Sequence, residues 1–437
     1  MRVYCARFIG IENCGRTGRN ILYFPYPILM ATYNLSQTFS SLKHPNFRLW
    51  FSGQIVSLIG TWMQATAQGY LVYELTGSPI MLGIVGFANG IPVWLFSLYA
   101  GIIADRISRK RLIMITQGSM MVLAFILAIL TFTDAIQAWH IVIMALLLGT
   151  ANAFDAPARQ SFVVDMVPRD DLTNAIALNS SVFNLGTIIG PSVAGLVYAW
   201  LGPAWCFTIN GASFIAVLIA LARMRIAPRP PVLNTERSIK RNLTEGLRYA
   251  FGDKNIRVLL IMLTVSAVFG FGLLNLMPAW ATHVLGGDVR TNGLLLSARG
   301  VGSLIGALMI AYLGARIVRG KLWTLGSLVM PVALIIFALV RTLPISLLML
   351  VVIGWSLMSV MNLTNALIQT HIPDELRGRV MSVYILLFQG GFPIGALVAG
   401  YLAGITSEAL TVFAFACVIL VVAVAIQVRQ PSIRDYN

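Results

Sequence analysis

Charged residues are scarce in this sequence. Only 11% of its 437 residues are Asp, Glu, Lys or Arg, whereas 58% are hydrophobic. A soluble globular domain is about a quarter charged, and a soluble fold of this size lacks the interior to bury so much apolar surface. The composition therefore indicates a membrane protein. Apolar segments recur along almost the whole chain, which excludes a single spanning helix or a signal peptide as the explanation.

Cysteine is also rare. Cys5 and Cys14 lie near the start of the chain, and Cys206 and Cys417 lie in apolar segments. This spacing matches neither a metal site nor a disulfide framework, so we expect no metal and no cofactor. The phosphate-binding signature Gly-x-x-x-x-Gly-Lys-[Ser/Thr] is absent, and nothing in the sequence indicates ATP drive. An enzyme would need clustered catalytic groups at membrane depth, and the sequence contains no such set.

Twelve apolar segments are long enough to cross a bilayer, which takes about 20 mainly apolar residues. Lipid cannot satisfy exposed backbone polar groups, so the segments must be helices. The sequence therefore predicts an all-α polytopic membrane protein with twelve transmembrane helices. Their approximate ranges are 47–73, 78–104, 112–133, 137–158, 173–200, 202–223, 256–284, 291–314, 322–340, 344–369, 377–405 and 407–428.

Acidic residues are half as frequent as basic ones, 16 against 31, and the net charge of +15 alone would suggest a nucleic-acid partner. The distribution of the bases argues against one. When both termini are placed inside, all but three of the 31 bases fall on the cytoplasmic side, the exceptions being Arg290, Arg299 and Arg341. This is the positive-inside pattern, with basic loops beside anionic lipid. We expect a multi-pass cell-membrane protein with both termini cytoplasmic, surrounded by the lipid bilayer and without a nucleic-acid partner.

The longest polar interruption, residues 224–255, divides the segments six and six. It begins as a proline-rich linker, after which Ile239, Leu243, Leu247 and Phe251 recur at steps of four. That pattern predicts an amphipathic helix on the inner membrane surface. A simple solvated linker helix is the alternative.

The predicted domains follow from this division. They are a leader (1–44), a six-helix bundle (45–223), the cytoplasmic linker (224–255), a second six-helix bundle (256–428) and a cytoplasmic tail (429–437). The apolar run in the leader is short and holds two prolines, so we do not expect it to span the membrane. Two interpretations of this segment are consistent with the sequence: a disordered leader, or a true start of the protein at Met30.

The two halves are related by an internal repeat. The stretch "GIVGFANG" (83–90) matches "GLLLSARG" (293–300) at an offset of 210 residues, and "GTIIGPSVAG" (186–195) matches "GFPIGALVAG" (391–400) at an offset of 205. Six crossings return the chain to its starting side, so both halves have the same orientation. Parallel repeats of this kind place the substrate site near mid-membrane, between the halves.

These motifs resemble the major facilitator superfamily. "GIIADRISRK" (101–110) fits its loop signature Gly-x-x-x-Asp-Arg-x-Gly-Arg-Lys, with Ser108 in place of the second Gly, and "GTIIGPSVAG" fits the fifth-helix pattern that marks its exporters. Residues 155–184 resemble the branch of siderophore (enterobactin-type) exporters and macrolide-efflux permeases. The resemblance implies two parallel six-helix repeats, the major facilitator fold. It further implies secondary active export of a small amphipathic molecule, siderophore or drug-like, by alternating access.

The resemblance also implies proton antiport, and we expect a monomer that binds a small-molecule substrate. An importer or a lipid flippase of the same fold is an alternative, as is a non-transporting sensor. The sequence offers no acid in mid-membrane for proton coupling, because Glu74 and Asp155 are predicted near opposite helix ends. The Arg that proton antiporters usually carry in the fourth helix would fall near Ala145.

In the superfamily, the acid and the second Arg of the loop signature form a latch on the inner side. The resemblance assigns this latch to Asp105 and Arg109, with Arg106 in the same motif and Asp155 as the partner of Arg109. The latch would hold the outward-facing state closed on the inside. Asp105 would face the positive N-terminal end of the eleventh helix. The alternative is that these charged residues only set the orientation of the chain in the membrane. That would account for the basic residues better than for Asp105. Ala315 stands where the second half would need its acid, so the latch would be one-sided.

Small residues line one face of the fifth helix and recur in its repeat. Glycines let helices approach closely, and proline bends a helix. We expect this face to pack against a neighbour and to act in gating, with ordinary close packing as the alternative. The residues are Gly186, Gly190, Pro191 and Gly195 in the first half, and Gly391, Pro393, Gly395 and Gly400 in the second.

Polar side chains form a stripe on one face of the first helix, at spacings of three and four residues. Amides that face lipid are costly, so the stripe faces protein or water; interhelical hydrogen bonds and a substrate cavity are equally open. The tenth helix combines an aromatic residue with neutral amides, which suits an amphipathic solute. The cavity candidates are Gln54, Ser57, Thr61, Gln64 and Gln68 in the first helix, and Trp355, Asn362 and Asn365 in the tenth.

Arg299 is the most informative single residue. It lies about eight residues into the eighth helix, or roughly 12 Å at 1.5 Å per residue, and an intramembrane Arg indicates function by default. Its repeat equivalent is Asn89, so both halves place a polar group at one level. We expect Arg299 to contact an anionic or phenolate-bearing substrate, or to act in gating. Outward snorkelling, or a fixed pair with Glu74, is the alternative.

Overall fold

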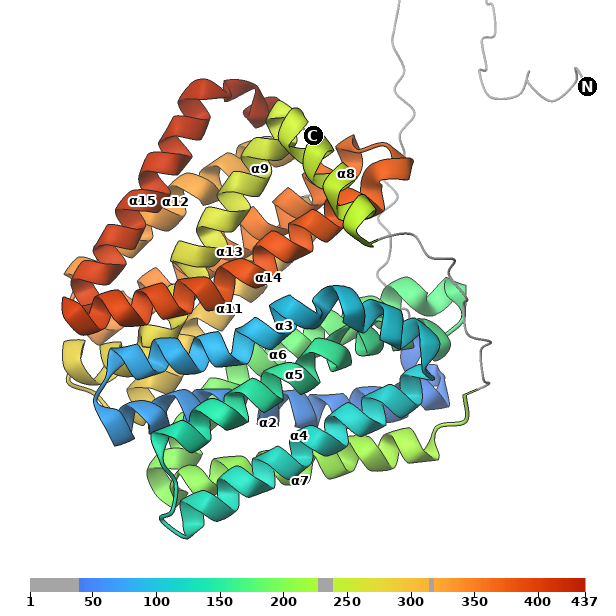
Figure 1. Ribbon diagram of the computed structural model, residues 1–437, viewed down its shortest axis with the longest axis vertical. Helices are drawn as coiled ribbons and strands as arrows, with labels where there is room; N and C mark the ends of the chain where they lie inside the picture. Colours follow the sequence, from blue (N-terminus) through green and yellow to red (C-terminus); the bar gives the residue numbers. More distant parts are fainter. Residues whose placement is uncertain (1–38, 227–238, 314–317, 437) are drawn as a thin grey trace, which may run out of the picture. The chain divides into compact units, whose positions relative to one another are not determined.

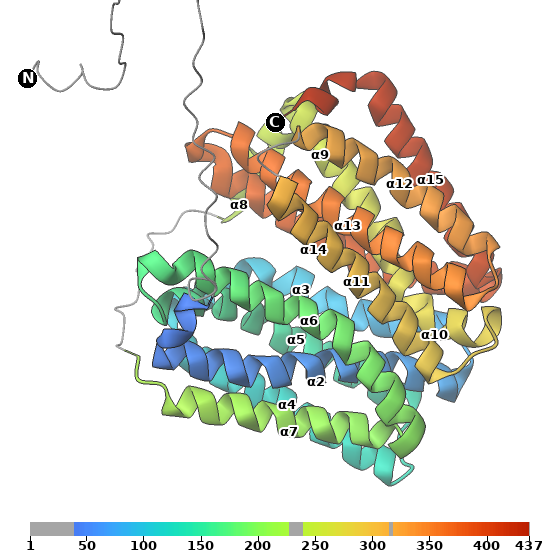
Figure 2. The ribbon, with the colours of Figure 1, turned by 180° about the vertical axis from the view of Figure 1, so that it is seen from behind.

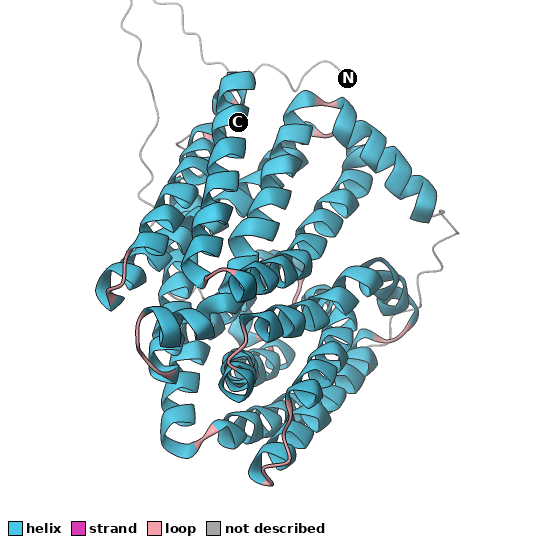
Figure 3. Cartoon of the chain, turned by 60° about the vertical axis from the view of Figure 1, so that its left-hand side comes forward, coloured by secondary structure: helices cyan, strands magenta, loops and turns pink. Residues whose placement is uncertain are grey.

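The computed structural model describes residues 39–226, 239–313 and 318–436, without the side chains of residues 97, 98, 101–106 and 239–243. Within these ranges nearly all residues are helical, and short loops join the helices (Figure 3). The first half consists of α2 (Pro45–Thr76), α3 (Pro79–Arg106), α4 (Arg109–Phe132), α5 (Ala138–Phe162), α6 (Arg169–Leu201) and α7 (Pro203–Arg223). The second consists of an interrupted helix that starts with α9 (Lys254–Val265), then α11 (Val289–Leu313), α12 (Arg319–Leu339), α13 (Leu343–His371), α14 (Asp374–Ile405) and α15 (Glu408–Arg429).

Consecutive helices run in opposite directions, so each half has two ends (Figure 1). The linker end holds the start of α2, the end of α7 and helix α8 (Ile239–Gly252), which precedes α9. The opposite end, which holds the loops after α2, α6 and α14, is called the distal end. The basic residues of the short loops lie mainly at the linker end.

Eleven of these helices are long and apolar enough to cross a membrane. The positions agree closely with the sequence prediction; the range 173–200, for example, becomes α6, Arg169–Leu201. Helix α2 has 32 residues but is not among the eleven. Its polar stripe lowers its mean hydropathy, so its apolar character is weaker than that of its neighbours.

Local signals fix several helix ends. Helices α2, α7 and α13 carry a proline in the first turn, where the missing N–H has no partner to lose. Helix α2 stops at Gly77, whose φ of 60° is a left-handed conformation that suits glycine. Part of each helix surface is buried in apolar clusters. The second half is built around Trp280, Trp323 and Phe337, all with at most 1% exposure.

The helix predicted over 256–284 is not regular. After α9 it passes through a π-helix (Ser266–Phe271), a 3-10 turn (Gly272–Leu276), the short α10 (Met277–Ala279) and a second π-helix, η5 (Trp280–Val284). Irregular backbone at membrane depth is tolerated where protein buries it or where it lines a cavity. Much of this segment is buried, because Ala267, Leu273, Leu276 and Trp280 all have 2% exposure or less.

The ends of the described chain pack on the linker end. Ser41, in a short turn η1 (Ser40–Lys43), donates a hydrogen bond of 2.6 Å from its Oγ to Asn174 Oδ1. Ser41, which falls in the predicted leader, thus packs on α6, while residues 1–38 lie outside the described residues. At the other end the tail is not free: the backbone N–H of Gly320 donates to Tyr436 O at 2.8 Å, and Ile433 is buried.

Candidate functional site

The two halves meet mainly through two helix pairs, α3 with α14 and α6 with α11 (Figures 1 and 2). Glycines bring these backbones into direct contact. A Cβ at Gly400 would lie only 2.6 Å from Pro79 O and 2.7 Å from Gly83 Cα. A Cβ at Gly300 would lie 2.7 Å from Thr187 O. Side chains of any size are therefore incompatible with these contacts as the structure shows them.

The glycines and prolines of the repeated pattern make two kinds of contact. The glycines at its start pack inside their own half: a Cβ at Gly186 would lie 2.9 Å from Trp62 Cδ1, and one at Gly391 would lie 2.7 Å from Ala267 Cβ. Gly190 packs on Trp62, and Gly395 packs on the π-helix at Val268. The prolines face the other half, because Pro191 O contacts Gly293 and Pro393 contacts Gly90.

These contacts between the halves are concentrated toward the distal end. Gly400, Gly195 and Gly293 lie within the first or last turns of their helices at that end. Within the described part of the chain, the deepest glycine contact joins Gly390 to the Trp94 side chain, in the middle of α14 and α3. The structure thus holds the halves together from the distal end to about mid-helix.

Polar bridges reinforce the distal contact. Ser192 Oγ on α6 donates to Ser297 Oγ on α11 at 2.7 Å. Tyr73 Oη at the end of α2 lies 2.9 Å from His283 Nδ1 in η5, and the His283 ring in turn lies 3.3 Å from Glu408 Oε1 at the start of α15. Sequence reasoning did not single out these residues. In the sequence, His283 is recognisable only as a histidine near the end of a predicted helix, and this position does not indicate which residues it contacts.

Arg299 lies in α11 at the level where these contacts end. Its backbone packs against Gly354, and its Nε is buried without a hydrogen-bond acceptor. Among the described residues, no carboxylate lies within ion-pair distance of its guanidinium. The alternative of a fixed pair with Glu74 is wrong, since Glu74 accepts a hydrogen bond from Tyr198 instead. In the described part of the chain, the Arg299 guanidinium is therefore without a carboxylate partner.

The polar stripe of α2 is turned into the first half. Gln64 Oε1 accepts a bond of 2.6 Å from Asn210 Nδ2 on α7, and Gln68 Nε2 donates to Ile141 O on α5 at 3.4 Å. Gln54 and Ser57 are also buried, and Thr61 bonds the carbonyl of Ser57 in its own helix. Of the two interpretations of the stripe, interhelical bonding accounts for Gln64 and Gln68. The Asn89 side chain similarly approaches Ala145 O, at 3.5 Å.

Asp155 lies at the centre of a buried polar network. Its side chain is fully buried, and its Oδ2 lies 2.6 Å from Arg159 Nε, one turn along α5. Thr116 Oγ1 donates to Oδ1 at 2.7 Å, and Gln117 Nε2 lies 3.2 Å from both carboxylate oxygens. The Arg159 guanidinium also reaches Gln54 Oε1 at 3.4 Å. Asp155 is thus more deeply enclosed than its predicted place near a helix end suggested.

The predicted pairing of Arg109 with Asp155 is not formed in this structure. Arg109 lies 3.2 Å from the carboxylate of Asp165, in the turn after α5, and also donates to Ser161 O. The reason is local: Arg159 is four residues from Asp155 on the same helix face and satisfies it first. The remaining latch residues, Asp105 and Arg106, have side chains outside the described residues.

The candidates on α13 lie within the second half. Trp355 donates from Nε1 to the sulfur of Met309 on α11 at 3.4 Å. Asn365 Oδ1 accepts from Gln369 Nε2 at 2.5 Å, and both Asn362 and Asn365 are partly exposed. Their amides are therefore accessible in part, and the structure shows no direct bond between them and the first half among the described residues.

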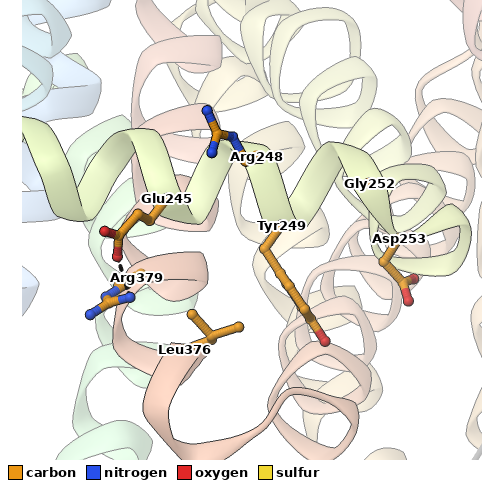
Figure 4. Close-up of a pocket in the computed structure, with 7 residues that line it drawn as sticks. All are labelled: Glu245, Arg248, Tyr249, Gly252, Asp253, Leu376 and Arg379. Atoms are coloured by element: carbon orange, nitrogen blue, oxygen red, sulfur yellow. Dashed lines mark ion pairs between the residues drawn. The ribbon is translucent and has the colours of Figure 1, made fainter.

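A surface groove of about 630 Å³ lies at the linker end, between α8 and the start of α14 (Figure 4). It is lined by Glu245, Arg248, Tyr249, Gly252, Asp253, Leu376 and Arg379. Glu245 forms an ion pair with Arg379, while Arg248 points away from the pair. The Glu245–Arg379 ion pair joins α8 to α14 of the second half. The groove lies at the linker end, away from the glycine contacts between the halves.

The family model described as Transmembrane secretion effector matches residues 36–436. The chain belongs to this family. It is a membrane transporter of the major facilitator superfamily, as its motifs predicted, and not an enzyme. Relatives of this transporter include two whose names refer to drug or siderophore traffic. The Staphyloferrin A transporter of Staphylococcus aureus is 26% identical over 80% of this chain and 87% of its own. The multidrug efflux pump Tap of Mycolicibacterium fortuitum is 27% identical over 86% and 94%.

Solved structures show the same fold at low identity. A bacterial homologue of the human lysosomal transporter Spinster, described as inward-facing and unoccupied, has a TM-score of 0.70 and 15% identity over 90% of this chain and 97% of that one. The nucleoside transporter NupG has a TM-score of 0.68 and 16% identity over 88% and 98%. The all-helical transporter fold predicted from the repeat is thereby confirmed at this coarse level.

Proposed function

We propose that this transporter exports a small amphipathic molecule by alternating access, in exchange for protons. The observation that carries the proposal is the uneven contact between the halves. The contacts described above join them at the distal end and stop near mid-helix, where the unpaired Arg299 lies. A rocking motion about this region would expose Arg299 to one side of the membrane and then the other.

The orientation of the proposal rests on charge. The linker end carries nearly all of the basic loop residues, so we place it and both termini in the cytoplasm of a cell membrane. The structure then corresponds to a state that is closed toward the outside. Helix α2 would be the twelfth crossing, since its polar face is covered by α5 and α7, and the twelve helices would form two parallel repeats around a monomeric transport path.

Export is supported by the exporter pattern in α6 and by the efflux function named for the relative Tap. A drug-like or siderophore substrate is supported by the same relatives and by the site itself. Trp355, Asn362 and Asn365 provide a partly exposed aromatic and amide surface on α13, and Arg299 adds a cation. Such a set suits an amphipathic molecule with an anionic or phenolate group.

The cytoplasmic latch is part of the proposal in revised form. We place Asp105 and Arg109 at the inner boundary, where the latch would close in the outward-facing state. In the present state, which is open toward the inside, Arg109 pairs with Asp165 of its own half. Asp155 is not part of this revised latch, because it forms an ion pair with Arg159. Proton exchange would then use a titratable group inside the bundle, and the fully buried carboxylate of Asp155 is the candidate that the structure supplies.

Arg299→Gln is expected to weaken substrate binding about tenfold or more. A hydrogen bond to a charged group contributes about 1.5–3 kcal/mol, and about 1.4 kcal/mol corresponds to a factor of ten. Inverted membrane vesicles would be incubated with radiolabelled staphyloferrin A, with and without a proton gradient, and the substrate concentration for half-maximal uptake would be measured. Uptake into inverted vesicles corresponds to export from the cell.

The matched control is Arg290→Gln, in the same helix but on the exposed distal surface, where Arg290 lies 4.0 Å from Asp288. It should leave uptake within a factor of two. Unchanged affinity and rate in Arg299→Gln would contradict the contact role, and substrate uptake only into right-side-out vesicles would contradict export.

A further inference from the structure

The bridge formed by Tyr73, His283 and Glu408 connects the two halves at the distal end. Tyr73 belongs to the first half, whereas His283 and Glu408 belong to the second. The phenol oxygen lies 2.9 Å from Nδ1 and 3.1 Å from Nε2 of the imidazole, and the two rings meet edge to face at 5.5 Å. Of the polar bridges between the halves described above, this is the one that contains an imidazole, which titrates near neutral pH.

Glu408 makes the bridge sensitive to protonation. Its side chain is only 10% exposed, whereas that of His283 is 59% exposed and reachable from the distal side. A carboxylate so far removed from water is costly without a compensating charge. An imidazolium 3.3 Å away supplies that charge and has N–H donors for both the carboxylate and the phenol oxygen. A neutral imidazole has one donor and leaves the carboxylate without a counter-charge.

The neighbouring charged groups do not supply this compensation. The segment η5 packs on α10, α11 and α15. Helix α10 has no titratable residue, and the titratable residue of the first turn of α11 is Arg290, whose nearest acid is Asp288. On α2, Glu74 is engaged by Tyr198, and Tyr70 packs edge-on against the Tyr198 ring. Arg341, also at this end, lies over the Trp280 ring.

We infer that His283 is a proton-binding site that locks the distal end, so that protons reaching it stabilise the distal-closed state. In that state the Tyr73 phenol oxygen, 2.9 Å from the imidazole, accepts a hydrogen bond from the imidazolium and so stabilises its charge beside Glu408. When the halves separate at this end, Tyr73 leaves and water weakens the pair. The proton is therefore held more tightly when the end is closed, and by linkage a lower pH shifts the population toward closure.

This inference uses the two alternating states of the proposed function and adds a regulatory site to it. With the distal end facing outward, acid outside the cell would speed the return of the emptied transporter to the state that accepts substrate from inside. The effect does not require His283 to carry the transported proton across the membrane.

The test measures the distance between the halves in solution. Spin labels would be attached at Thr133 and Thr342, two exposed distal positions on opposite halves, after replacement of the native cysteines by serine. Distance distributions would be recorded by pulsed electron paramagnetic resonance in detergent between pH 5.5 and pH 8. The wild-type ratio of closed to open molecules is expected to rise about three- to tenfold on acidification over this range.

His283→Gln should abolish this pH dependence, and Tyr73→Phe should reduce it while leaving His283 and Glu408 in place. The matched control is His140→Gln. His140 is the other histidine at the distal end, and its Nδ1 accepts from the backbone N–H of Gln137 within the first half. A pH dependence that persists in His283→Gln, or disappears in His140→Gln, would overturn the assignment.

Gly400→Leu separates this proposal from the proposed function, because it should populate the open distance at every pH. If that variant shows the open distance but the wild-type ratio does not respond to pH, only the proton lock is wrong. If no sample shows a second distance, alternating access fails and the lock fails with it.

Discussion

Gly400→Leu is expected to lower the transport rate more than tenfold while the protein still folds. The three nearest atoms to a side chain at this position all belong to the backbone of α3, at 2.6 Å from Pro79 O, 2.7 Å from Gly83 Cα and 2.8 Å from Gly83 N. Backbone atoms cannot rotate away as a flexible side chain can, so the distal ends of α14 and α3 must separate. The open state at that end needs no such contact, and the population shifts toward it.

Gly378→Leu is the matched control, because it makes the same change in the same helix at a position with no heavy atom within 4 Å. It should retain the parental rate. Uptake of labelled macrolide into inverted vesicles measures the rate, and expression level with size-exclusion profile measures folding. Parental uptake by Gly400→Leu would show that α3 and α14 need not touch during the cycle.

The positions of the helices could be predicted from the sequence because one physical requirement dominates them. A span in lipid must be apolar and helical over about 20 residues, and charges and prolines mark its ends. The close approach of the two halves could be predicted for a related reason. Glycines such as Gly83 and Gly400 sit where two backbones touch, so their spacing reports the contact between halves directly.

Irregular backbone could not be predicted in the same way. The segment 266–284 has the apolar composition of an ordinary helix, and Gly270, Gly272 and Pro278 are of types common in membrane helices. Its π-helical and 3-10 turns depend on what lies against it, which is the glycine face of α14 at Gly391 and Gly395. Only the packed structure contains that information.

Partner choice was the weakest part of the prediction. The periodicity of α2 showed that Gln54, Gln64 and Gln68 share a face, but not which helices cover it. Family resemblance assigned Asp155 to Arg109, although a closer signal was present in the chain. Arg159 follows Asp155 by four residues, which is one helical turn, and it is the partner that the structure shows.

This partner choice leads to a large expected effect on stability. Arg159→Gln is expected to destabilise the first half by about 3 kcal/mol, the lower end of the range for a buried pair that loses one member. The Asp155 carboxylate, with 0% exposure, would keep Thr116 and Gln117 but lose its only charged partner in the described structure. Unfolding in a fixed detergent, followed by helical circular dichroism, should show a lower midpoint.

The double variant Asp155→Asn/Arg159→Gln should be more stable than Arg159→Gln alone, because it removes the uncompensated charge as well as the pair. Arg377→Gln is the control. Its ion pair with Asp374 is also helical, one turn apart, but the two side chains are 46% and 81% exposed, and such pairs contribute about 0.5 kcal/mol or less. Equal losses in Arg159→Gln and Arg377→Gln, or a double variant as unstable as the sum of its parts, would mean that Asp155 does not depend on Arg159. Recovery in the double variant combined with loss of proton-driven uptake would instead separate the two tasks of Asp155, holding the first half together and exchanging the proton.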